Sequence, residues 1–382
     1  MSIAIVLGTR PEIIKMAPVI RECRRRGLEH FVIHTGQHYS YEMDRVFFEE
    51  LELQPAEYNL DAGSGTHAEQ TGRIMSGVEK VLMKREPDVV LVQGDTNTVL
   101  AGALAAAKLH INVGHVEAGL RSYDRSMPEE INRVVADHIS DYLFAPTEGS
   151  RANLLKEGIA AEKISVTGNT IVDSVYQSRE IASRKATAIR DLGLSPGEYF
   201  LATAHRAENV DSRERLEEIV RGLELIEREL GMPVIFPMHP RTRKMAKEFG
   251  LALDGIRAVE PLGFLEFLQI EACARLVLTD SGGVQEEACI LGVPCVTLRE
   301  NTERPETVDV GANVLAGMGA AGVLASAREM LSRRRTWKNP YGNGMAGRMI
   351  ATICEGLLGE MRIPTESTIT GYDDKVQKIK AS

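Results

Sequence analysis

Short apolar runs alternate with segments of helical periodicity along the whole chain, and this alternation restricts the fold more than any other feature. Strands that alternate with helices of roughly ten to fifteen residues indicate βαβ units, and therefore doubly wound parallel sheets. Pro18 lies inside the first helical segment, where a proline is expected to kink or restart the helix. The sequence predicts an α/β protein, whose strands are Ile3–Leu7, Phe31–Thr35, Asp88–Val92, Asn112–Val116, Tyr142–Ala145, Lys163–Val166, Tyr199–Ala204, Pro233–Pro237, Ile256–Val259, Leu276–Thr279, Cys295–Leu298 and Asn313–Ala316.

The 382 residues are enough for two domains, and the pattern places a boundary near Gly168-Asn169. We expect residues 1–169 to form the first domain and residues 170–345 the second, with an amphipathic connecting helix over Thr170–Arg190. Residues 346–382 would supply a last helix that crosses back to the first domain, followed by a polar tail. Because ligands bind beyond the carboxyl ends of the strands in such sheets, two facing sheets predict a deep cleft between the domains.

Composition argues against several classes of function. The formal net charge of −9 argues against nucleic acid as the main partner, because phosphate backbones require a basic surface. The five cysteines are scattered and form no CxxC motif, which indicates a reducing compartment and no metal site. The N-terminal stretch lacks the features of a signal peptide, and no segment approaches the ~20 apolar residues that span a bilayer. We therefore expect a cytoplasmic protein with no membrane partner.

The segment Leu276–Thr297 contains a strand, a glycine elbow and a helix in succession. Ser281, Gly282 and Gly283 lie at the elbow, where the missing Cβ atoms let a ligand approach the backbone and the helix N-terminus favours an anion. Glu287 lies one turn further into the helix, where a carboxylate can accept a ribose hydroxyl. Taken alone, so short a motif is more typical of a capped turn than of a ligand site, so the rest of the chain must decide.

Basic residues follow other predicted strands. His205 follows the run FLATA, His239 follows VIFPM, and Arg304 lies after VTL. The first domain adds Arg10 and Lys15. Any one of them is explained by a capped turn or a solvated face, but an acidic protein that gathers such groups at one level is expected to bind a phosphorylated ligand. The simplest such ligand is a pyrophosphate.

Carboxylates follow the strands of the first domain. Asp95 alone could cap a helix, and Glu129 alone could be an ordinary partner of a helix dipole. Glu117 ends the apolar run NVGHV, where a carboxylate is poorly solvated and needs a reason. If the three converge, desolvation and mutual repulsion should raise the pKa of at least one, as proton transfer near neutral pH requires. Acid/base groups on one wall and anion-binding groups on the other predict an enzyme.

Two common nucleotide-binding motifs are excluded. The run GMGAAG at 317–322 fits the pattern GxGxxG, but no second strand ending in an acidic residue follows it. The pattern GxxxxGK[ST] does not occur. The sequence therefore predicts neither an NAD site nor nucleoside triphosphate hydrolysis, and we expect no cofactor.

Six motifs together give the chain a specific resemblance. They resemble the non-hydrolysing UDP-N-acetylglucosamine 2-epimerases over roughly residues 3–358, and they read GTRPEIIKMAP at 8–18, QGDTNT at 93–98, GHVEAGLRS at 114–122, MPEEINR at 127–133, TDSGGVQEE at 279–287 and RPE at 304–306. The resemblance implies the glycosyltransferase-B fold, with two Rossmann-like domains around a cleft, and a homodimer. It also implies interconversion of UDP-N-acetylglucosamine and UDP-N-acetylmannosamine without a redox cofactor, for use in polysaccharide biosynthesis.

The same resemblance implies roles for individual residues. Glu287 matches the family's ribose ligand, and Phe267 lies where the family packs an aromatic ring near uracil. Gln37, Arg73 and His239 match an effector pocket found in members that UDP-N-acetylglucosamine activates, although Ser40 replaces a second glutamine there. The implied catalytic residues are Asp95, Glu117, Glu129, Lys15 and His205, and the implied substrate-binding residues are Arg10, Phe267, Ser281, Gly282, Gly283, Glu287 and Arg304.

The mechanism that the resemblance implies is elimination of UDP across carbons 1 and 2 of the sugar, followed by addition to the other face of the glycal. Such a scheme needs a carboxylate base, a second acid/base group and cations for the departing diphosphate. Four alternatives stay open: an epimerase of a 6-deoxy or uronic UDP-sugar, a glycosyltransferase, a hydrolysing epimerase and a non-catalytic nucleotide-sugar sensor.

Overall fold

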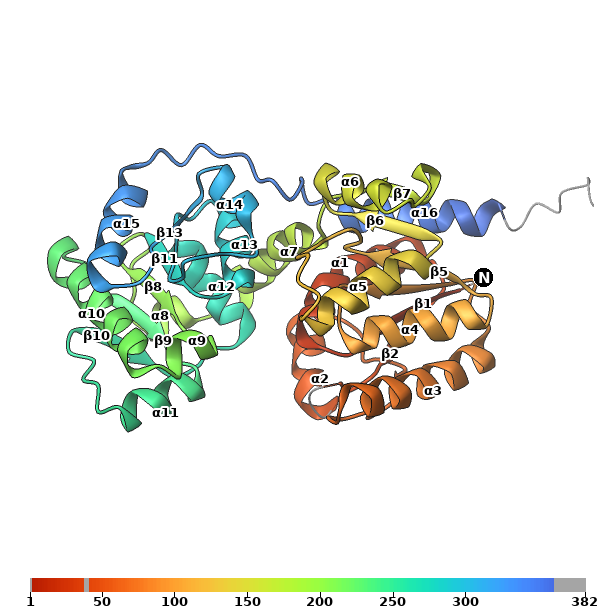
Figure 1. The fold of residues 1–382 in the computed structure, drawn as a ribbon, viewed down its shortest axis with the longest axis horizontal. Coiled ribbons are helices and arrows are strands. Elements are labelled where there is room, and N and C mark those ends of the chain that lie inside the picture. The colour runs from red at the N-terminus through yellow and green to blue at the C-terminus, as the bar shows by residue number, and fades with distance from the viewer. Residues whose placement is uncertain (1, 38–40, 361–382) are drawn as a thin grey trace, which may run out of the picture.

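Two parallel sheets, one in each half of the chain, organise the structure, a computed structural model that describes residues 2–37 and 41–360 (Figure 1). In the described residues the first sheet has the order β3-β2-β1-β4-β5-β6-β7 and the second the order β10-β9-β8-β11-β12-β13. The strands are β1 Ile3–Leu7, β2 His30–His34, β3 Tyr58–Asn59, β4 Val89–Gln93, β5 Asn112–Val116, β6 Tyr142–Ala145, β7 Ile164–Val166, β8 Phe200–Thr203, β9 Val234–Pro237, β10 Ile256–Val259, β11 Leu276–Thr279, β12 Cys295–Thr297 and β13 Asn313–Leu315.

Helices cover both faces of each sheet, which confirms the predicted α/β class. In the part of the chain that the structure describes, none of them is long and apolar enough to cross a membrane. The helices are α1 Arg10–Arg26, α2 Tyr41–Glu50, α3 His67–Arg85, α4 Asn97–Lys108, α5 Pro128–Ile139, α6 Glu148–Lys156, α7 Thr170–Lys185, α8 Ala188–Asp191, α9 Ala207–Val210, α10 Arg213–Leu230, α11 Pro240–Glu248, α12 Phe264–Cys273, α13 Gly282–Leu291, α14 Pro305–Asp309, α15 Ala320–Ser332 and α16 Ala346–Glu360, with a short 3-10 turn at Ala161–Lys163.

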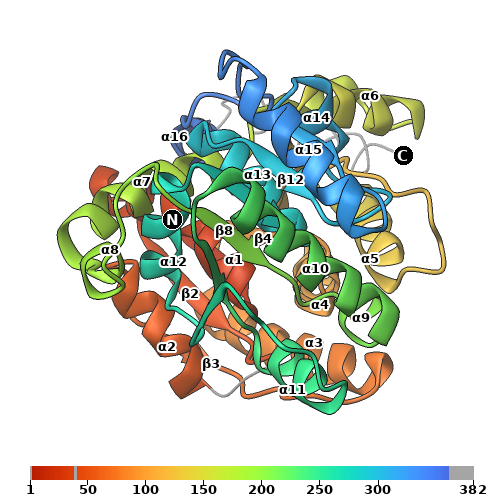
Figure 2. The ribbon, with the colours of Figure 1, turned by 90° about the vertical axis from the view of Figure 1, so that its left-hand side faces the viewer.

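Successive residues of each strand face opposite cores, as the pleat of a strand dictates. In β1, Ile3, Ile5 and Leu7 pack with α1, α7 and α16, whereas Ala4 and Val6 pack with α3 and α4 on the other face. The second sheet is covered in the same way, with α10 and α15 side by side on one face (Figure 2) and α12 and α13 on the other.

The first helix does not restart at Pro18, contrary to the prediction, but runs unbroken from Arg10 to Arg26. A proline inside a helix removes the N–H that would bond the carbonyl four residues earlier, here that of Ile14. The hydroxyl of Ser174 on α7 donates to that carbonyl at 2.8 Å. A neighbouring helix therefore supplies the missing hydrogen bond, and α1 continues.

The last described helix, α16, lies against the first domain although the chain reaches it from the second (Figure 1). Asp173 of α7 accepts the backbone N–H groups of Ala346 and Gly347 at 3.2 and 3.0 Å, which caps the start of α16. A Cβ atom at Gly347 would lie 2.9 Å from Pro18, so the two helices approach closely there. The predicted polar tail lies, from residue 361 onward, outside the described residues.

Candidate functional site

Four of the predicted site residues lie at the topological switch points of the two parallel sheets. At a switch point, the connections that leave two neighbouring strands run toward opposite edges of the sheet. Arg10 begins α1 after β1, and Asp95 follows β4, which pairs with β1. His205 follows β8, and Ser281 follows β11, which pairs with β8. Open α/β sheets bind ligands in the crevice at such points.

The two switch points share one electrostatic environment. Lys15 on α1 interacts with Glu286 on α13 and with Arg304 at the start of α14, and Arg10 interacts with Glu287. Side chains from the two halves of the chain therefore interact electrostatically with one another.

A buried ion pair occupies the first-domain side of this site. The ammonium of Lys15 lies 2.8 Å from both carboxylate oxygens of Glu117, and the amide of Gln93 donates to the same carboxylate. The Lys15 side chain is 14 % exposed and that of Glu117 only 4 %. Glu117 has a left-handed backbone, with φ of +71°, which costs a residue other than glycine about 1 kcal/mol. Strain and burial at one carboxylate indicate a functional rather than a structural position.

The electrostatics of Glu117 differ from the expectation. Burial alone would raise its pKa, but the charge and hydrogen bonds of Lys15 hold that pKa below its ordinary value. Burial alone would likewise lower the pKa of Lys15, and Glu117 and Glu286 raise it instead. The raised carboxylate pKa that convergence of Asp95, Glu117 and Glu129 would produce is not found at Glu117, because its neighbour is a cation rather than a second carboxylate.

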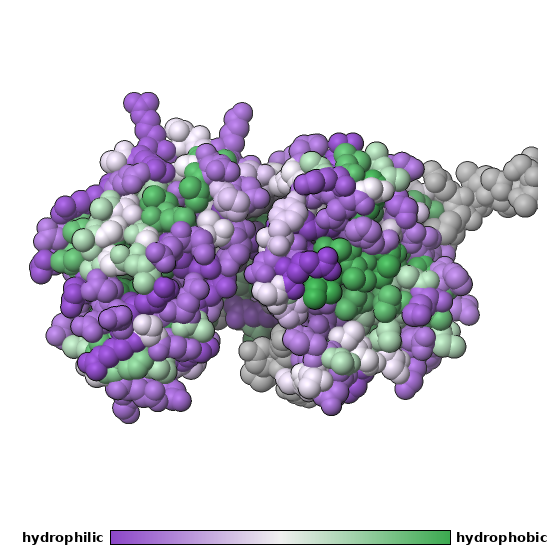
Figure 3. All heavy atoms as spheres, in the orientation of Figure 1, coloured by the Kyte–Doolittle hydropathy of each residue, from purple (hydrophilic) through white to green (hydrophobic). Residues whose placement is uncertain are grey.

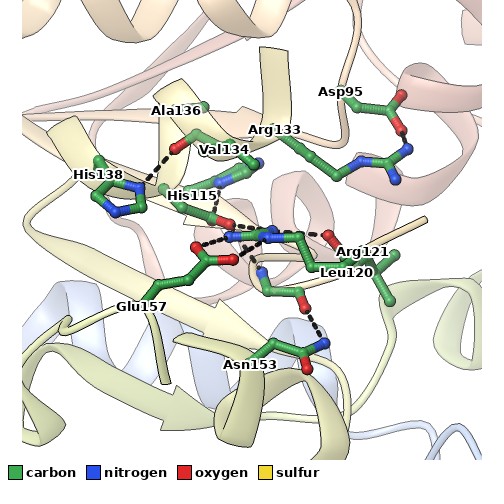
Figure 4. Close-up of polar contacts among 12 residues, drawn as sticks. Asp95, His115, Leu120, Arg121, Arg133, Val134, Ala136, His138, Asn153 and Glu157 are labelled. Atoms are coloured by element: carbon green, nitrogen blue, oxygen red, sulfur yellow. Dashed lines mark hydrogen bonds and ion pairs between the residues drawn. The ribbon is translucent and has the colours of Figure 1, made fainter. Parts of the chain in front are cut away.

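The structure does not join Asp95, Glu117 and Glu129 by any hydrogen bond among the described residues. Asp95 forms an ion pair with Arg133 of α5 (Figure 4), and its side chain is 34 % exposed. Glu129 is exposed in the first turn of α5, and its carboxylate has no ion pair or hydrogen bond within residues 2–37 and 41–360. The neighbouring Glu130 is the buried carboxylate of that turn, and it accepts bonds from the loop before α5.

An aspartate that the sequence analysis missed fixes the second-domain elbow. Asp280 is fully buried directly after β11 and accepts the backbone N–H of His205 at 3.0 Å and that of Arg206 at 2.9 Å. It also lies 3.2 Å from Nδ1 of His205, whose side chain stays 42 % exposed. The sequence signal that could have identified Asp280 was an acidic residue directly after a predicted buried strand. Asp280 therefore holds His205 with its ring open to the site.

His239 lies close to His205, and the centroids of the two rings are 6.0 Å apart. Burial and the neighbouring His205 and Arg241 lower the pKa of His239, which favours its neutral form. The other two predicted effector residues lie in the first domain. Gln37 is buried and accepts the N–H of Thr98 at 3.0 Å, whereas Arg73 is exposed and donates to a backbone carbonyl. Ser40, the departure from the effector pattern, lies outside the described residues.

The glycine elbow leaves the start of α13 open. Ser281 is the N-cap residue, yet its hydroxyl makes no capping hydrogen bond. A Cβ atom at Gly282 would meet nothing closer than 3.8 Å, and one at Gly283 nothing closer than 3.9 Å. Because internal packing does not require glycine at either position, the open space suits close approach of a ligand to the helix N-terminus.

Cations surround this elbow. Arg304 forms an ion pair with Glu286 at 2.7 Å, and Glu286 raises the pKa of Arg304. A Cβ atom added at Gly282 would lie 3.9 Å from the side chains of Arg206 and Arg304 and 3.8 Å from a carboxylate oxygen of Glu303. On the facing domain, the guanidinium of Arg10 lies 4.6 Å from the ring centre of Phe47. Arg206 and Arg304 therefore lie beside the start of α13, and each is paired with a carboxylate, Glu303 and Glu286 respectively.

Two carboxyl groups, the buried Glu271 and the half-buried Glu287, lie behind the elbow. Burial raises the pKa of Glu287 to about 7, and burial and the Glu287 carboxylate raise that of Glu271 on α12. Repulsion between the two carboxylates favours the protonated form of Glu271. Phe267 lies one turn before Glu271 on α12 and packs against the core that also contains Val284 of α13. The predicted ribose and base contacts thus lie on adjacent helices.

The family profile described as UDP-N-acetylglucosamine 2-epimerase matches residues 21–355. The chain belongs to this family. Among curated relatives in the family, the UDP-N-acetylglucosamine 2-epimerase of Methanocaldococcus jannaschii is 56% identical over 92% of this chain and 98% of the relative. The UDP-2,3-diacetamido-2,3-dideoxy-D-glucuronate 2-epimerase of Pseudomonas aeruginosa is 43% identical over 92% of this chain and 98% of that relative.

Solved structures of family members agree with the fold. The M. jannaschii epimerase in complex with UDP-GlcNAc and UDP has a TM-score of 0.82 and 56% identity, over 93% of this chain and 99% of that chain. The Neisseria meningitidis epimerase bound to UDP-GlcNAc has a TM-score of 0.82 and 36% identity, over 93% of this chain and 100% of that chain. These matches confirm the predicted family and the predicted glycosyltransferase-B fold class.

Proposed function

We propose that this protein interconverts UDP-N-acetylglucosamine and UDP-N-acetylmannosamine by inverting carbon 2 of the sugar. The observation that carries the proposal is the buried Lys15–Glu117 pair, which shares one electrostatic site with the cation-lined glycine elbow of the other domain. The relative that is 56% identical has been solved with UDP-GlcNAc and UDP bound, and the nucleotide sugar is carried over from it.

The second domain is proposed to hold the UDP portion. The free N–H groups at the start of α13, the open Ser281 hydroxyl and the guanidinium of Arg304 suit a diphosphate. Arg10 would add charge from the first domain. Glu287 and Phe267 would contact the ribose and the uracil. The elbow thus stabilises the diphosphate both when it is bound to the sugar and when it departs.

The first domain is proposed to move the proton. Carbon 2 is not next to a carbonyl, so its proton becomes removable only as the bond from carbon 1 to the diphosphate breaks. A carboxylate takes that proton, the bonding pair becomes the double bond of the glycal, and UDP leaves with the electrons of the broken bond. Re-addition of UDP with a proton delivered to the other face gives the epimer. Asp95, Glu117 and Glu129 are the proposed acid/base residues, and Lys15 and His205 are proposed to assist.

A second candidate substrate is a uronic UDP-sugar. The 43% identical P. aeruginosa relative acts, by its name, on a diacetamido glucuronate, and it covers this chain as fully as the first relative does. The chain is more similar to the UDP-N-acetylglucosamine epimerase of M. jannaschii, which favours the first candidate. A panel that includes both sugars distinguishes the two.

We further propose a homodimer, whose contact face includes α4 and α5. Figure 3 shows hydrophobic residues gathered over these helices. Leu100 and Leu104 remain partly exposed on α4, and Ile131 on α5 is 45 % exposed.

Five free cysteines, four of them buried, support the proposed cytoplasmic location. Because the product is an activated sugar, its proposed use is polysaccharide biosynthesis.

The testing experiment is proton NMR of the protein with UDP-N-acetylglucosamine in deuterium oxide. We expect a UDP-N-acetylmannosamine signal with deuterium at carbon 2 and without added NAD. Asp95→Asn and Glu117→Gln should each abolish turnover while UDP still binds by calorimetry, whereas Arg10→Ala should weaken UDP binding itself. Free N-acetylmannosamine would indicate the hydrolysing reaction instead, and equal loss of UDP affinity in both carboxylate variants would contradict their proposed role.

A further inference from the structure

A buried histidine lies beneath the proposed acid/base residues and is not part of the proposed chemistry. His115 stands two residues before Glu117 on β5, and its side chain is fully buried. Its Nδ1 atom lies 2.7 Å from a carboxylate oxygen of Asp137, and its Nε2 atom lies 2.8 Å from the carbonyl oxygen of Gly94. Figure 4 shows the ring of His115 beside the guanidinium of Arg121, which in turn meets Glu157.

The partners of His115 determine its protonation. The Gly94 carbonyl can only accept a hydrogen bond, so Nε2 must carry a proton. Asp137 also accepts from Arg121 at 2.7 Å and from the N–H of Gly119 at 3.1 Å, and these donors keep it ionised. A second acceptor therefore faces Nδ1, which must carry a proton as well.

The charges around the ring agree with the conclusion that both ring nitrogens of His115 carry a proton. Burial alone would lower the pKa of His115, but Asp137 and, more weakly, Glu117 raise it. Arg121 is the remaining charged group of the cluster, and its charge is balanced by Asp137 and Glu157. The imidazolium, Asp137 and Arg121 therefore form a closed network with little access to water.

The hydrogen bond to Gly94 acts directly on the neighbouring elbow. Gly94 has φ of +87°, a left-handed conformation that glycine adopts readily, and its N–H donates to Val116 at 3.1 Å. The next residue is Asp95, whose backbone carbonyl accepts from Asn132 at 3.0 Å. The Gly94 carbonyl is thus held by β5, and the carbonyl of the next residue, Asp95, is held by α5.

We propose that His115 is a positioning residue, a protonated imidazolium that donates one hydrogen bond to Asp137 and one to the Gly94 carbonyl, and that the second bond fixes the Gly94–Asp95 peptide against β5. It thereby sets where the Asp95 carboxylate lies relative to Glu117. The proposal rests on the proposed function insofar as Asp95 and Glu117 are taken as the reacting groups. The protonation of the ring can be tested whether or not the protein is an epimerase.

The first experiment is NMR of the full-length protein with ¹⁵N-labelled histidine. Both ring nitrogens of His115 should show an attached proton from about pH 7.5 to about pH 9, a range in which an ordinary histidine is mostly neutral. The signals are assigned by their absence in His115→Gln. A single protonated nitrogen in this range would overturn the proposal, and this readout needs neither substrate nor turnover.

The second experiment compares kinetics and binding for His115→Gln with the control His138→Gln. His138 is an exposed histidine of α5 in the same view (Figure 4), and among the described residues its ring is bonded only to the backbone carbonyl of Val134 in its own helix. His115→Gln should lower kcat about 100-fold, the size expected for a misplacement of roughly 1 Å, while the Kd for UDP stays unchanged. The control should match the unmodified protein.

A third variant separates charge from position. Asp137→Asn can donate to Nδ1, which leaves a neutral ring whose Nε2 still bonds to Gly94. We expect it to lose less activity than His115→Gln, because the elbow stays held. Unchanged kcat in His115→Gln, or an equal loss of UDP affinity, would overturn the positioning role. Absence of epimerisation in the unmodified protein would instead refute the proposed function and leave the NMR result to decide on His115.

Discussion

Replacing Lys15 by methionine should make the stability of this protein strongly dependent on pH. The substitution keeps the length and much of the volume of the side chain but leaves the Glu117 carboxylate buried without its cation. The Glu117 side chain is only 4 % exposed, so solvent cannot replace the lost partner. Removing one partner of a buried ion pair typically costs about 3–5 kcal/mol.

Proton uptake by Glu117 limits this loss of stability and makes the loss depend on pH. Without Lys15, burial should raise the pKa of Glu117, and each unit of that rise is worth about 1.4 kcal/mol. A rise of about 2.5 units above the unfolded value costs roughly 3.4 kcal/mol at pH 8, where the unfolded state is ionised. The cost falls to about 1 kcal/mol near pH 5, because the folded carboxyl is then protonated. The destabilisation therefore grows as the pH rises.

Denaturant unfolding followed by circular dichroism between about pH 5 and about pH 8 measures this effect. The double variant Lys15→Met/Glu117→Gln should recover most of the lost stability at pH 8, since no buried charge remains. Arg25→Met serves as a control on the same helix, because water screens its exposed pair with Glu22 and its loss should change stability little at any pH. A loss in Lys15→Met that is independent of pH, or no recovery in the double variant, would refute the reasoning.

Two further predictions concern the nucleotide half of the site. Gly282→Ala should preserve or raise the melting temperature, because its Cβ meets nothing closer than 3.8 Å and alanine favours a helix by about 1 kcal/mol. The same variant should weaken UDP binding at least about tenfold by calorimetry, and unchanged affinity would exclude close contact at the elbow. Because burial raises the pKa of Glu287 to about 7, uridine affinity should fall as the pH drops from about 8 to about 6. In Glu287→Gln that pH dependence should vanish; its persistence would assign the titration to another group.

Periodicity predicted the sheets well but not their details. The alternation of apolar runs gave twelve strands, and the structure adds β3, which has only two residues and pairs at the edge of the first sheet. So short a strand leaves no pattern of its own. The continuity of α1 through Pro18 could not be predicted from the sequence either, because it depends on the hydroxyl of Ser174, which only the folded chain brings close to α1.

For the candidate site as well, the sequence predicted where residues lie along the sheets but not which distant residues they contact. The elbows could be located from the sequence, because carboxyl ends of parallel strands meet at one edge whatever the details of packing. The partners of the elbow residues could not, since the Lys15–Glu117 pair and the His115–Asp137 pair join segments distant in sequence. The direction of a pKa shift follows from such partners, so the sequence could not show that Lys15 holds the pKa of Glu117 below its ordinary value.

The return of α16 to the first domain reverses the usual relation between synthesis and folding. Ile350 and Cys354 of this helix are buried in the same core as Ile20 and Cys23 of α1. Domains generally fold in the order in which they leave the ribosome. Here the domain that is made first is completed last, because the growing chain exposes one apolar face of α1 until the second domain has been synthesised. Any truncation before residue 346 leaves that face permanently uncovered.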